Sequence, residues 1–378
     1  MVEGARLESV YTVKGIKGSN PFLSASYMEK KIINWGIIGL GNAAKNLSSG
    51  FCNSKNSKLL AIASKDYSKI NYFKEKFFID DKYCFSDYES IIKCKDIDII
   101  YIALPNSFHK EWIINCAINK KNILVEKPSV LNFLEIKEVI KAVKENKVFL
   151  MEGFLYRCHP QTFKLIEILK SNLIGTIFNI YSSFGFDALG YKNYFGIKFR
   201  KKPNNKKRLF SKELGGGAIL DMGCYPVSMS RMIAYSLFNN KFEEPQFKNI
   251  NREIGITGVV ESAKADLVFK NKDKTIIANI ETSIVKGLRN ITEIKGTKGS
   301  ILVESPWLPD GNSKIYLKTQ EGEKILKTTE NNINIFANQI SYVSECLLKN
   351  LKEALFPATN INDITLNVKC LDTWSKGL

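Results

Sequence analysis

A glycine-rich turn is the first feature of this sequence that could do chemistry. Residues 39–44 read Gly-Leu-Gly-Asn-Ala-Ala, directly after an apolar run and before a helical pattern, and match G-x-G-x-x-G/A. In that pattern the first glycine makes a tight turn, the second lets a pyrophosphate approach the backbone, and the third small residue packs the helix on the strand. The helix amides then face the phosphates. We therefore expect a dinucleotide to bind at Gly39, Leu40, Gly41, Asn42, Ala43 and Ala44.

The end of the next apolar run bears on the identity of that dinucleotide. Sites that select NAD usually place Asp or Glu there, where the carboxylate binds the ribose 2′-hydroxyl. Here the run ends at Ala63 and is followed by Ser64 and Lys65. A hydroxyl beside a cation suits a 2′-phosphate, so we expect Ser64 and Lys65 to bind NADP. NAD stays as the alternative, because Asp66 follows.

Two later strand ends also carry polar residues. The apolar run 97–104 leads into Pro105 and Asn106, and the run 123–125 leads into Glu126-Lys127-Pro128. In a doubly wound sheet, ligands bind beyond the carboxyl ends of the strands. Pro128 favours an extended backbone at Lys127 and ends the strand there, and the Lys127–Pro128 bond could be cis. We expect cofactor contacts from Leu104, Pro105, Asn106, His109, Glu126 and Lys127.

An alternation of strands and helices positions these residues. Strands alternating with helices predict βαβ units and a parallel sheet that is covered on both faces. The predicted fold class is therefore α/β, with a Rossmann-type, doubly wound parallel sheet over residues 31–154. Strands are predicted at 32–38, 59–63, 83–85, 97–104, 123–125 and 148–151, and helices at 43–52, 68–78, 88–93, 111–119 and 131–145.

The pattern changes after about residue 155. Short apolar runs joined by hairpin-type turns predict an α+β domain over residues 155–378 with an open, mostly antiparallel sheet. Helices are predicted at 159–170, from Gly215 to about 235, at 333–351 and at 361–375. Strands are predicted at 176–186, 264–270, 275–284, 290–296, 300–304, 314–319 and 323–328.

Composition excludes several classes of protein. Lys and Arg total 55 against 38 Asp and Glu, but the lysines are scattered, and no zinc-finger, RNA-recognition or helix-turn-helix signature accompanies them. We expect no nucleic-acid partner. The eight cysteines form no C-x-x-C and no metal-ligand pattern, so we expect no metal and a reducing, cytoplasmic setting. No apolar run reaches the roughly 18 residues of a membrane span, and the first 27 residues lack a secretory apolar region.

The first 30 residues show no clear periodicity. Met28-Glu29-Lys30-Lys31 immediately precedes the first strand, and Gly18-Ser19-Asn20-Pro21-Phe22 is similar to an in-frame translation of a transfer-RNA gene. We interpret residues 1–30 as a disordered tail or as an artefactual extension, with translation starting at Met28. The DNA upstream of Met28 decides between the two.

Five motifs in order resemble the Gfo/Idh/MocA oxidoreductase family, which includes glucose–fructose oxidoreductase and inositol dehydrogenase. They are GIIGLGNAA, IALPNSFH, VEKP, MEGFLYRCHP and LGGGAILDMGCYP, spread over residues 36–226. The last two look closest to the branch of dihydrodiol and xylose dehydrogenases, which favours NADP. The resemblance implies a Rossmann domain, an α/β domain with an open antiparallel sheet, and a final helix, 361–375, that packs back on the Rossmann domain.

By matching motif, the resemblance also implies catalytic residues. Lys127 matches the catalytic lysine, and Asp221 and Tyr225 match the pair D-x-x-x-H/Y. Their i, i+4 spacing puts both on one helical face. An unperturbed tyrosine titrates near ~10, and a neighbouring ammonium would lower that value. We assign acid/base catalysis to Tyr225, electrostatic support and proton relay to Lys127, and orientation of Lys127 or of substrate hydroxyls to Asp221.

Other polar residues near these motifs are weaker candidates for substrate contacts. Tyr156, Arg157 and His159 leave the last strand of the first domain, where they could line a cleft or pack a domain junction. Arg208 lies in the loop before Gly215 and could cover the site. The basic run 198–202 suits an anionic substrate, although a solvated loop is the more common role. His109 and His159 receive no catalytic role, since a lone histidine is more often structural.

The sequence thus predicts an NADP-dependent oxidoreductase. Its reaction would transfer hydride between the nicotinamide and a CH–OH or C=O group of a sugar, polyol or cyclic diol. Two alternatives keep the fold: an NAD(P)-binding sensor or regulatory subunit, and redox-neutral, NAD-assisted glycoside cleavage. An exposed apolar face on the antiparallel sheet would make the protein a homo-dimer or homo-tetramer.

Overall fold

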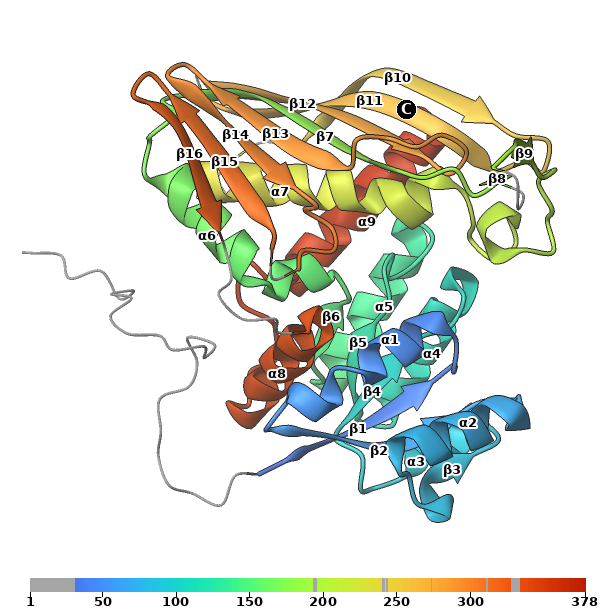
Figure 1. Ribbon diagram of the computed structural model, residues 1–378. Helices are drawn as coiled ribbons and strands as arrows, with labels where there is room; N and C mark the ends of the chain where they lie inside the picture. The colour runs from blue at the N-terminus through green and yellow to red at the C-terminus, as the bar shows by residue number, and fades with distance from the viewer. Residues whose placement is uncertain are drawn as a thin grey trace, which may run out of the picture.

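The computed structural model shows two large sheets, one above the other in Figure 1, with helices packed against and between them. The structure describes residues 31–192, 196–239, 242, 244–272, 274–310, 312–327 and 334–378. The interpretation of residues 1–30 therefore concerns residues that lie outside this description.

The first sheet has six parallel strands in the order β3-β2-β1-β4-β5-β6. The order reverses at β1, where β2 and β4 lie on opposite sides, so the carboxyl ends of β1 and β4 flank the switch point of a doubly wound sheet. The α/β Rossmann prediction is confirmed, with strand and helix ends moved by a few residues. The strands are β1 Ile33–Ile38, β2 Ser57–Ala63, β3 Cys84–Phe85, β4 Ile99–Ile102, β5 Asn122–Val125 and β6 Leu150–Glu152.

Helices cover both faces of this sheet because its strands are apolar on both sides. On one face, Ile100, Ile102 and Ile123 pack against residues of α4 and α5. On the other, Trp35, Ile37 and other strand residues pack against residues of α1 and α2. The helices of this domain are α1 Asn42–Ser48, α2 Tyr67–Phe77, α3 Tyr88–Lys93, α4 His109–Ile118 and α5 Phe133–Asn146.

Two helices from the end of the sequence return to the first sheet. Helix α8, Ile335–Leu348, places Ile340 and Val343 in the core beside Trp35, whose indole N–H donates to Ser344 Oγ at 2.9 Å. Helix α9, Ile361–Lys376, has its first turns in the core of α4 and α5 and its last turns in the core of the second sheet. The sequence reading placed α8 in the second domain, because an amphipathic pattern does not specify which sheet a helix covers.

The second sheet has eight strands in the order β10-β11-β12-β7-β13-β14-β15-β16. It is antiparallel except where β12 pairs with β7, so the predicted mostly antiparallel sheet is confirmed. The edge strand β10 and the β8–β9 hairpin were not predicted. The strands of this sheet are β7 Ile177–Gly185, β10 Gln246–Ile254, β11 Val260–Asn271, β12 Lys274–Ser283, β13 Ile291–Gly296, β14 Gly299–Glu304, β15 Lys314–Thr319 and β16 Gly322–Lys327. Strands β8 Gly190–Lys192 and β9 Lys198–Arg200 form a separate two-stranded sheet.

Helices α6, Pro160–Lys170, and α7, Cys224–Phe238, cover one face of the eight-stranded sheet. The other face is more polar than the sequence led us to expect. Asn279 donates to Asp266 at 2.6 Å, and Asn179 donates to Asn279 at 2.8 Å. Tyr181 donates to Glu281 at 3.1 Å. This face therefore carries a hydrogen-bonded polar ladder across its central strands and not a continuous apolar surface.

Two classes of feature are absent from the described part of the chain. No helix there has the length and apolar character that crossing a membrane requires. No group of three or more His, Cys, Asp or Glu side chains there could hold a metal ion.

Candidate active site

The turn after β5 is held by hydrogen bonds that its backbone N–H groups donate to the strands on both sides. Glu126 donates its N–H to Ile102 of β4 at 3.0 Å, and the Lys127–Pro128 peptide bond is cis. Ser129 then donates its N–H to the Glu152 carboxylate at 2.7 Å. Glu152 is fully buried at the end of β6, and burial raises the pKa of its carboxyl to about 8. The turn is thus fixed between the ends of the two neighbouring strands.

Lys127 projects from this turn to the start of α7. Its ammonium donates to the Asp221 backbone carbonyl at 2.7 Å and lies 3.7 Å from the Asp221 carboxylate. Asp221 belongs to a π-helical turn, Ile219–Gly223, that leads into α7. Pro226, five residues beyond Asp221, has no N–H for that carbonyl in a π-helical register. The carbonyl is therefore available to a lysine from the other domain.

Asp221 lies between two cations. Its carboxylate receives a hydrogen bond from Arg208 at 2.7 Å in addition to the ion pair with Lys127. Burial raises the pKa of this carboxyl, but the charges of Lys127 and Arg208 outweigh burial and the net pKa is lowered. Burial alone would lower the pKa of the Lys127 ammonium. The effect of burial is outweighed by the nearby acidic groups, above all Tyr225 and Asp221, so the net pKa is raised. Both groups therefore stay charged at neutral pH.

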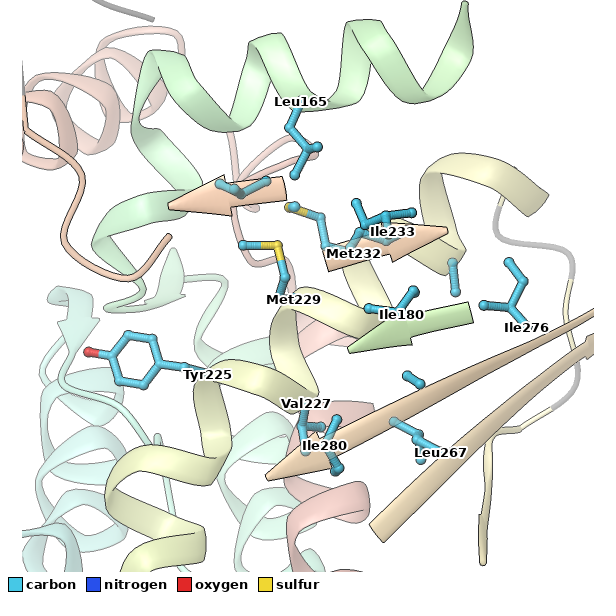
Figure 2. Close-up of a cluster of buried hydrophobic side chains, with 14 of the residues drawn as sticks. Leu165, Ile180, Tyr225, Val227, Met229, Met232, Ile233, Leu267, Ile276 and Ile280 are labelled. Atoms are coloured by element: carbon cyan, nitrogen blue, oxygen red, sulfur yellow. The ribbon is translucent and has the colours of Figure 1, made fainter. Parts of the chain in front are cut away.

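Tyr225 stands at the edge of the second domain's core, one helical turn after Asp221. Figure 2 shows its hydroxyl pointing away from Met229, Val227 and the other labelled apolar side chains. Its ring contacts Phe154, Phe184 and Trp307 edge-on or tilted, with centroids 5.0–5.7 Å apart. Among the described residues no hydrogen bond to this hydroxyl occurs, which leaves it available to a ligand.

The electrostatics of Tyr225 differ from the sequence expectation. The Lys127 ammonium lies over the Tyr225 ring, 5.0 Å from its centroid, and makes no hydrogen bond to the hydroxyl. Burial raises the pKa of Tyr225, and the Lys127 charge, which lowers it, does not overcome burial. The expected net lowering is therefore wrong for this arrangement, in which the phenol keeps its proton.

Tyr101 is a buried residue of β4 that sequence reasoning did not single out. Its hydroxyl donates to the Glu126 carboxylate, next to Lys127, and burial raises the pKa of both groups. Glu126, predicted as a cofactor contact, thus has one carboxylate oxygen engaged within the protein. The signals in the sequence were slight: one tyrosine in an apolar strand and, for Glu152, one carboxylate in MEGF.

The glycine-rich turn has the shape that a dinucleotide requires. Gly39 has φ +85°, and a Cβ there would meet the Ala103 carbonyl oxygen at 2.7 Å, so no other residue fits without strain. At Gly41 a Cβ would meet nothing within 4 Å, so this backbone faces open space. Leu40 and Ala44 are buried below the turn, and Asn42 and Ala43 are at least partly exposed at its surface. The residues present fit the pyrophosphate of a dinucleotide.

The carboxylate that follows β2 is bonded within the protein. Asp66 caps α2 by accepting from the N–H groups of Ser68 and Lys69, and its own N–H donates to Ser64 Oγ at 3.1 Å. Lys65 lies 5.9 Å from the centroid of the Tyr88 ring. With Asp66 engaged in the cap, Ser64 and Lys65 are the remaining polar residues at this strand end.

The loop after β4 mostly binds other protein groups. Leu104 and Pro105 are partly buried at the strand end. Asn106 is buried and donates to the Gly215 carbonyl at 2.8 Å, which ties this loop to the second domain. His109 is fully buried, and its ring nitrogens lie 2.9 Å from the carbonyl oxygens of Pro128 and Leu104. Burial lowers the pKa of His109 to about 4, so the neutral ring donates to only one of these carbonyls, but both ring nitrogens face protein atoms and His109 braces two strand ends. Its predicted cofactor contact stays a prediction.

The structure also separates the four weaker candidates. Arg157 is fully buried and donates to Ser228, to the Pro357 carbonyl at 2.9 Å and to Asp363 at 3.0 Å. The Tyr156 hydroxyl donates to Ser228 at 2.9 Å. His159 caps α6 by accepting from Gln161, and burial lowers its pKa to about 4. The polar groups of these three residues are thus bonded to protein atoms at the domain junction, and Arg208 is the one of the four that binds a charged group of the site. The predicted substrate contacts of Tyr156, Arg157 and His159 stay predictions.

Comparison with known proteins agrees with this architecture. Residues 33–154 match a model described as an oxidoreductase family with an NAD-binding Rossmann fold, and residues 163–302 match the GFO/IDH/MocA C-terminal domain. A trans-1,2-dihydrobenzene-1,2-diol dehydrogenase of Xenopus tropicalis is 30% identical over 89% of this chain and 96% of its own. The mouse enzyme of the same name is 26% identical over 85% of this chain and 90% of its own.

Two solved structures share the fold at lower identity. An aldose–aldose oxidoreductase of Caulobacter crescentus, complexed with glycerol, has a TM-score of 0.77 and 20% identity, covering 92% of this chain and 97% of that one. A 3-ketoreductase of Actinomadura kijaniata, complexed with NADP and TDP-benzene, has a TM-score of 0.74 and 20% identity, covering 91% and 97%. At this identity the likeness concerns the fold alone.

Proposed function

Because the chain belongs to the Gfo/Idh/MocA family of oxidoreductases, we propose that it is an NADP-dependent enzyme of CH–OH and C=O groups. Its substrate would be a sugar, a polyol or a cyclic diol. The observation that carries the proposal is the convergence of Lys127, Asp221 and Tyr225 from two domains at the carboxyl edge of the six-stranded sheet. This is the edge that also bears the glycine-rich turn.

Tyr225 supplies the proton in the proposed mechanism. Bound NADPH supplies the hydride for carbonyl reduction. Since burial raises the pKa of Tyr225, the phenol is protonated at neutral pH and can donate to the oxygen of the carbonyl as negative charge develops there. The resulting phenolate is stabilised by the ammonium of Lys127, which already lies against the ring. Oxidation of an alcohol is the reverse, and requires Tyr225 to lose its proton first.

Asp221 and Arg208 position Lys127. An ionised carboxylate between two cations fixes the direction of the Lys127 side chain and compensates part of its charge. The cis-proline turn, bonded to Glu152, fixes the other end of the same side chain. Lys127 is thus restrained at its backbone and at its ammonium, which favours an organised site before substrate arrives.

NADP is the proposed cofactor because the end of β2 offers a hydroxyl and a cation while Asp66 is engaged in a helix cap. Glycine-turn residues 39–44 would hold the pyrophosphate, and Ser64 and Lys65 the 2′-phosphate. The complex of the A. kijaniata ketoreductase with NADP supports the choice. Lys65→Ala should lower kcat/KM for NADP by about five-fold and leave NAD unchanged, since one exposed charge contact is worth ~1 kcal/mol. A preference for NAD in the unaltered protein would contradict this assignment.

A substrate panel tests the reaction itself. Sugars, polyols and cyclic diols are offered with NADP, and the matching carbonyl compounds with NADPH, while absorbance is followed at the reduced nicotinamide band. The relatives named dihydrodiol dehydrogenase make cyclic diols the first choice. We expect turnover that Lys127→Met abolishes. Tight NADPH binding with no hydride transfer to any member would instead support a sensor or regulatory role.

We further propose a cytoplasmic homo-dimer or homo-tetramer. All eight cysteines are unpaired, which supports a reducing setting. The uncovered face of the eight-stranded sheet is the surface where a second copy would pack, through its polar ladder. Light scattering measures the mass in solution, and a monomer at micromolar concentration would contradict the assembly.

A further inference from the structure

One segment of the chain has a charge composition unlike the rest. Residues 188–212 contain nine Lys or Arg and no Asp or Glu, whereas the whole chain has 55 Lys or Arg to 38 Asp or Glu. The segment spans the β8–β9 hairpin and the stretch that leads to Gly215. We call its described part after the hairpin turn, residues 196–212, the basic loop. Such a local excess of one sign creates a positive potential wherever the loop lies.

The basic loop lies at the rim of the active site. It carries Arg208, which reaches Asp221 at 2.7 Å, and it continues into Gly215, whose carbonyl accepts from Asn106 of the first domain at 2.8 Å. Gly215 has φ +70°, and a Cβ there would overlap the Leu131 side chain and Asn106, so this approach requires glycine. Figure 1 shows β8 and β9 near the end of the sheet where α7 begins. The loop therefore bridges the two domains where Lys127, Asp221 and Tyr225 meet.

A small core holds the loop in place. Phe210 and Leu189 are buried against Ala218, Val259 and other apolar residues at the end of the eight-stranded sheet. Gly216 and Gly217 donate their N–H groups back to the Ser211 and Leu209 carbonyls. The lysines thus extend from a segment that has its own apolar anchor and that reaches the active site through Arg208.

Most cations of the basic loop form no ion pair with a described residue. Arg200 pairs with Asp187 at 3.2 Å, and Arg208 pairs with Asp221. By contrast, no ion pair among the described residues uses the exposed side chains of Lys198, Lys202, Lys206, Lys207 and Lys212. An enzyme of uncharged diols gains nothing from five unpaired cations on the loop that carries Arg208, since like charges repel one another and disfavour a compact loop.

We propose that the substrate carries a phosphate group, distant from the carbon that is oxidised, and that the basic loop binds this phosphate. The inference rests on the proposed oxidoreductase function and names the substrate class of the same site. Lysines act on phosphate as mobile point charges, which suits exposed side chains around a loop. The phosphate belongs to the substrate and not to NADP, because the glycine-rich turn and the end of β2 lie on the first domain and the loop contacts the reacting residues.

Two kinds of molecule supply such a phosphate: a sugar phosphate and a nucleotide-linked sugar. The hairpin bears on the choice, because the rings of Tyr191 and Phe199 stack at 5.6 Å and are each more than 40% exposed. An exposed aromatic pair could stack on a nucleobase. Tyr191→Ser with Phe199→Ser therefore separates the sources: it weakens a nucleotide-linked sugar and leaves a sugar phosphate unchanged.

The first test measures anion binding and does not require the enzyme to turn over a substrate. Calorimetry on the NADPH-loaded protein measures affinity for inorganic pyrophosphate, for the unaltered chain and for the fourfold variant Lys198→Gln, Lys202→Gln, Lys206→Gln and Lys207→Gln. We expect at least about a five-fold loss of affinity in the variant, and weaker binding at higher salt. The matched control removes four exposed cations of the first domain: Lys55→Gln, Lys58→Gln, Lys95→Gln and Lys144→Gln. It should bind pyrophosphate like the unaltered chain.

Kinetics provides the second test. Each sugar of the panel is paired with its phosphate ester and with its nucleotide-linked form, and kcat/KM is compared at low and high salt. We expect phosphate-bearing members to be preferred at least about ten-fold, and the fourfold variant to lose that preference through KM while its kcat on neutral members stays unchanged.

The outcomes separate the two proposals. Equal turnover of neutral and phosphorylated members, or equal pyrophosphate affinity in the fourfold variant and the unaltered chain, overturns the phosphate proposal and leaves the oxidoreductase standing. Turnover of no member, despite pyrophosphate binding that requires the loop, overturns the oxidoreductase and keeps the anion site. NADPH affinity that falls in the fourfold variant would reassign the loop to the cofactor.

Discussion

Two polar clusters lie at the boundary between the domains, and they use their charges differently. The junction cluster consists of Tyr156, Arg157, Ser228, Arg231 and Asp363, and the active-site cluster of Lys127, Arg208, Asp221 and Tyr225. In the junction cluster Arg157 donates from Nε and both terminal nitrogens, always to protein atoms. In the active-site cluster Arg208 is 40% exposed and the Tyr225 hydroxyl has no partner among the described residues.

The difference shows how to distinguish a structural charge from a functional one. Both clusters contain a buried cation, a carboxylate and a tyrosine, and both come from motifs that looked functional in the sequence. Buried polar groups are normally hydrogen-bonded, so a fully bonded arginine has no capacity left for a ligand. The Tyr225 hydroxyl keeps that capacity, because it bonds no described residue and points away from the apolar core, whereas the two Arg231 nitrogens that lack a partner are buried inside the junction.

Lys127→Met should have the largest effect on the active-site cluster. It removes the ammonium that stabilises the phenolate, and we expect turnover to fall by about 10³–10⁴-fold while NADPH affinity changes little. The matched control is Lys121→Met, at the opposite end of β5, where a buried ammonium donates to the Ile97 carbonyl at 2.8 Å. That variant should lose stability and keep its kcat. Equal kcat losses in the two variants would remove Lys127 from catalysis.

Arg157→Met breaks the junction cluster. It leaves Asp363 with Arg231 alone and Ser228 without its strongest donor, so the free energy of unfolding should fall by ~3–5 kcal/mol. Denaturant titration measures the loss, and kcat per folded molecule should stay within about three-fold. A large kcat loss at unchanged stability would return Arg157 to the substrate site.

Tyr225→Phe removes only the hydroxyl oxygen of the active-site tyrosine, and so tests the difference between the two clusters at one atom. Since no described residue bonds this hydroxyl, stability should hardly change, whereas the rate should fall by at least ~10²-fold through loss of the proton donor. Tyr156→Phe is the control from the same aromatic cluster, with ring centroids 6.3 Å apart. Its hydroxyl is bonded to Ser228, so it should lose ~1 kcal/mol of stability and little rate. A rate change of less than a few-fold in Tyr225→Phe would assign the proton to another group.

Glu152→Gln tests the residue that lies between the clusters, and its expected effect is the smallest. Burial raises the pKa of this carboxyl from 4.5 to about 8, so between those pH values the folded state holds a proton that the unfolded state has lost. Stability should therefore fall as pH rises through this window, by at least about 1 kcal/mol more in the unaltered chain than in the variant. Denaturant titrations from pH 5 to 8 measure the slope, and parallel slopes would contradict the raised pKa.

Sequence reasoning succeeded where a local pattern fixes a position. The order of strands and helices placed residues 39–44 and Lys127 at one edge of a parallel sheet, because every parallel strand ends at that edge. The spacing of Asp221 and Tyr225 put both on one helical face, and the family resemblance associated that face with Lys127. The roles of these residues remain predictions, and the variants above test them.

The sequence could not predict which polar groups are already bonded. Arg157 is structural because Pro357 and Asp363 lie against it, and both are distant in the sequence. His109 is structural because the loop after β5 brings the Pro128 carbonyl to its ring. The pKa of Tyr225 depends on whether an ammonium lies over a ring or at a hydroxyl, a difference of side-chain geometry that no motif encodes.

Helix α8 has a consequence for how this protein is made. It covers part of a sheet whose last strand ends at Glu152, yet it begins only at Ile335. A ribosome adds roughly 5–20 residues per second, so the sheet emerges at least ~10 s before this cover exists. During that interval Trp35 and its apolar neighbours lack the packing of Ile340 and Val343. The nascent chain should therefore bind chaperones that recognise apolar segments until the residues of α8 have left the ribosome.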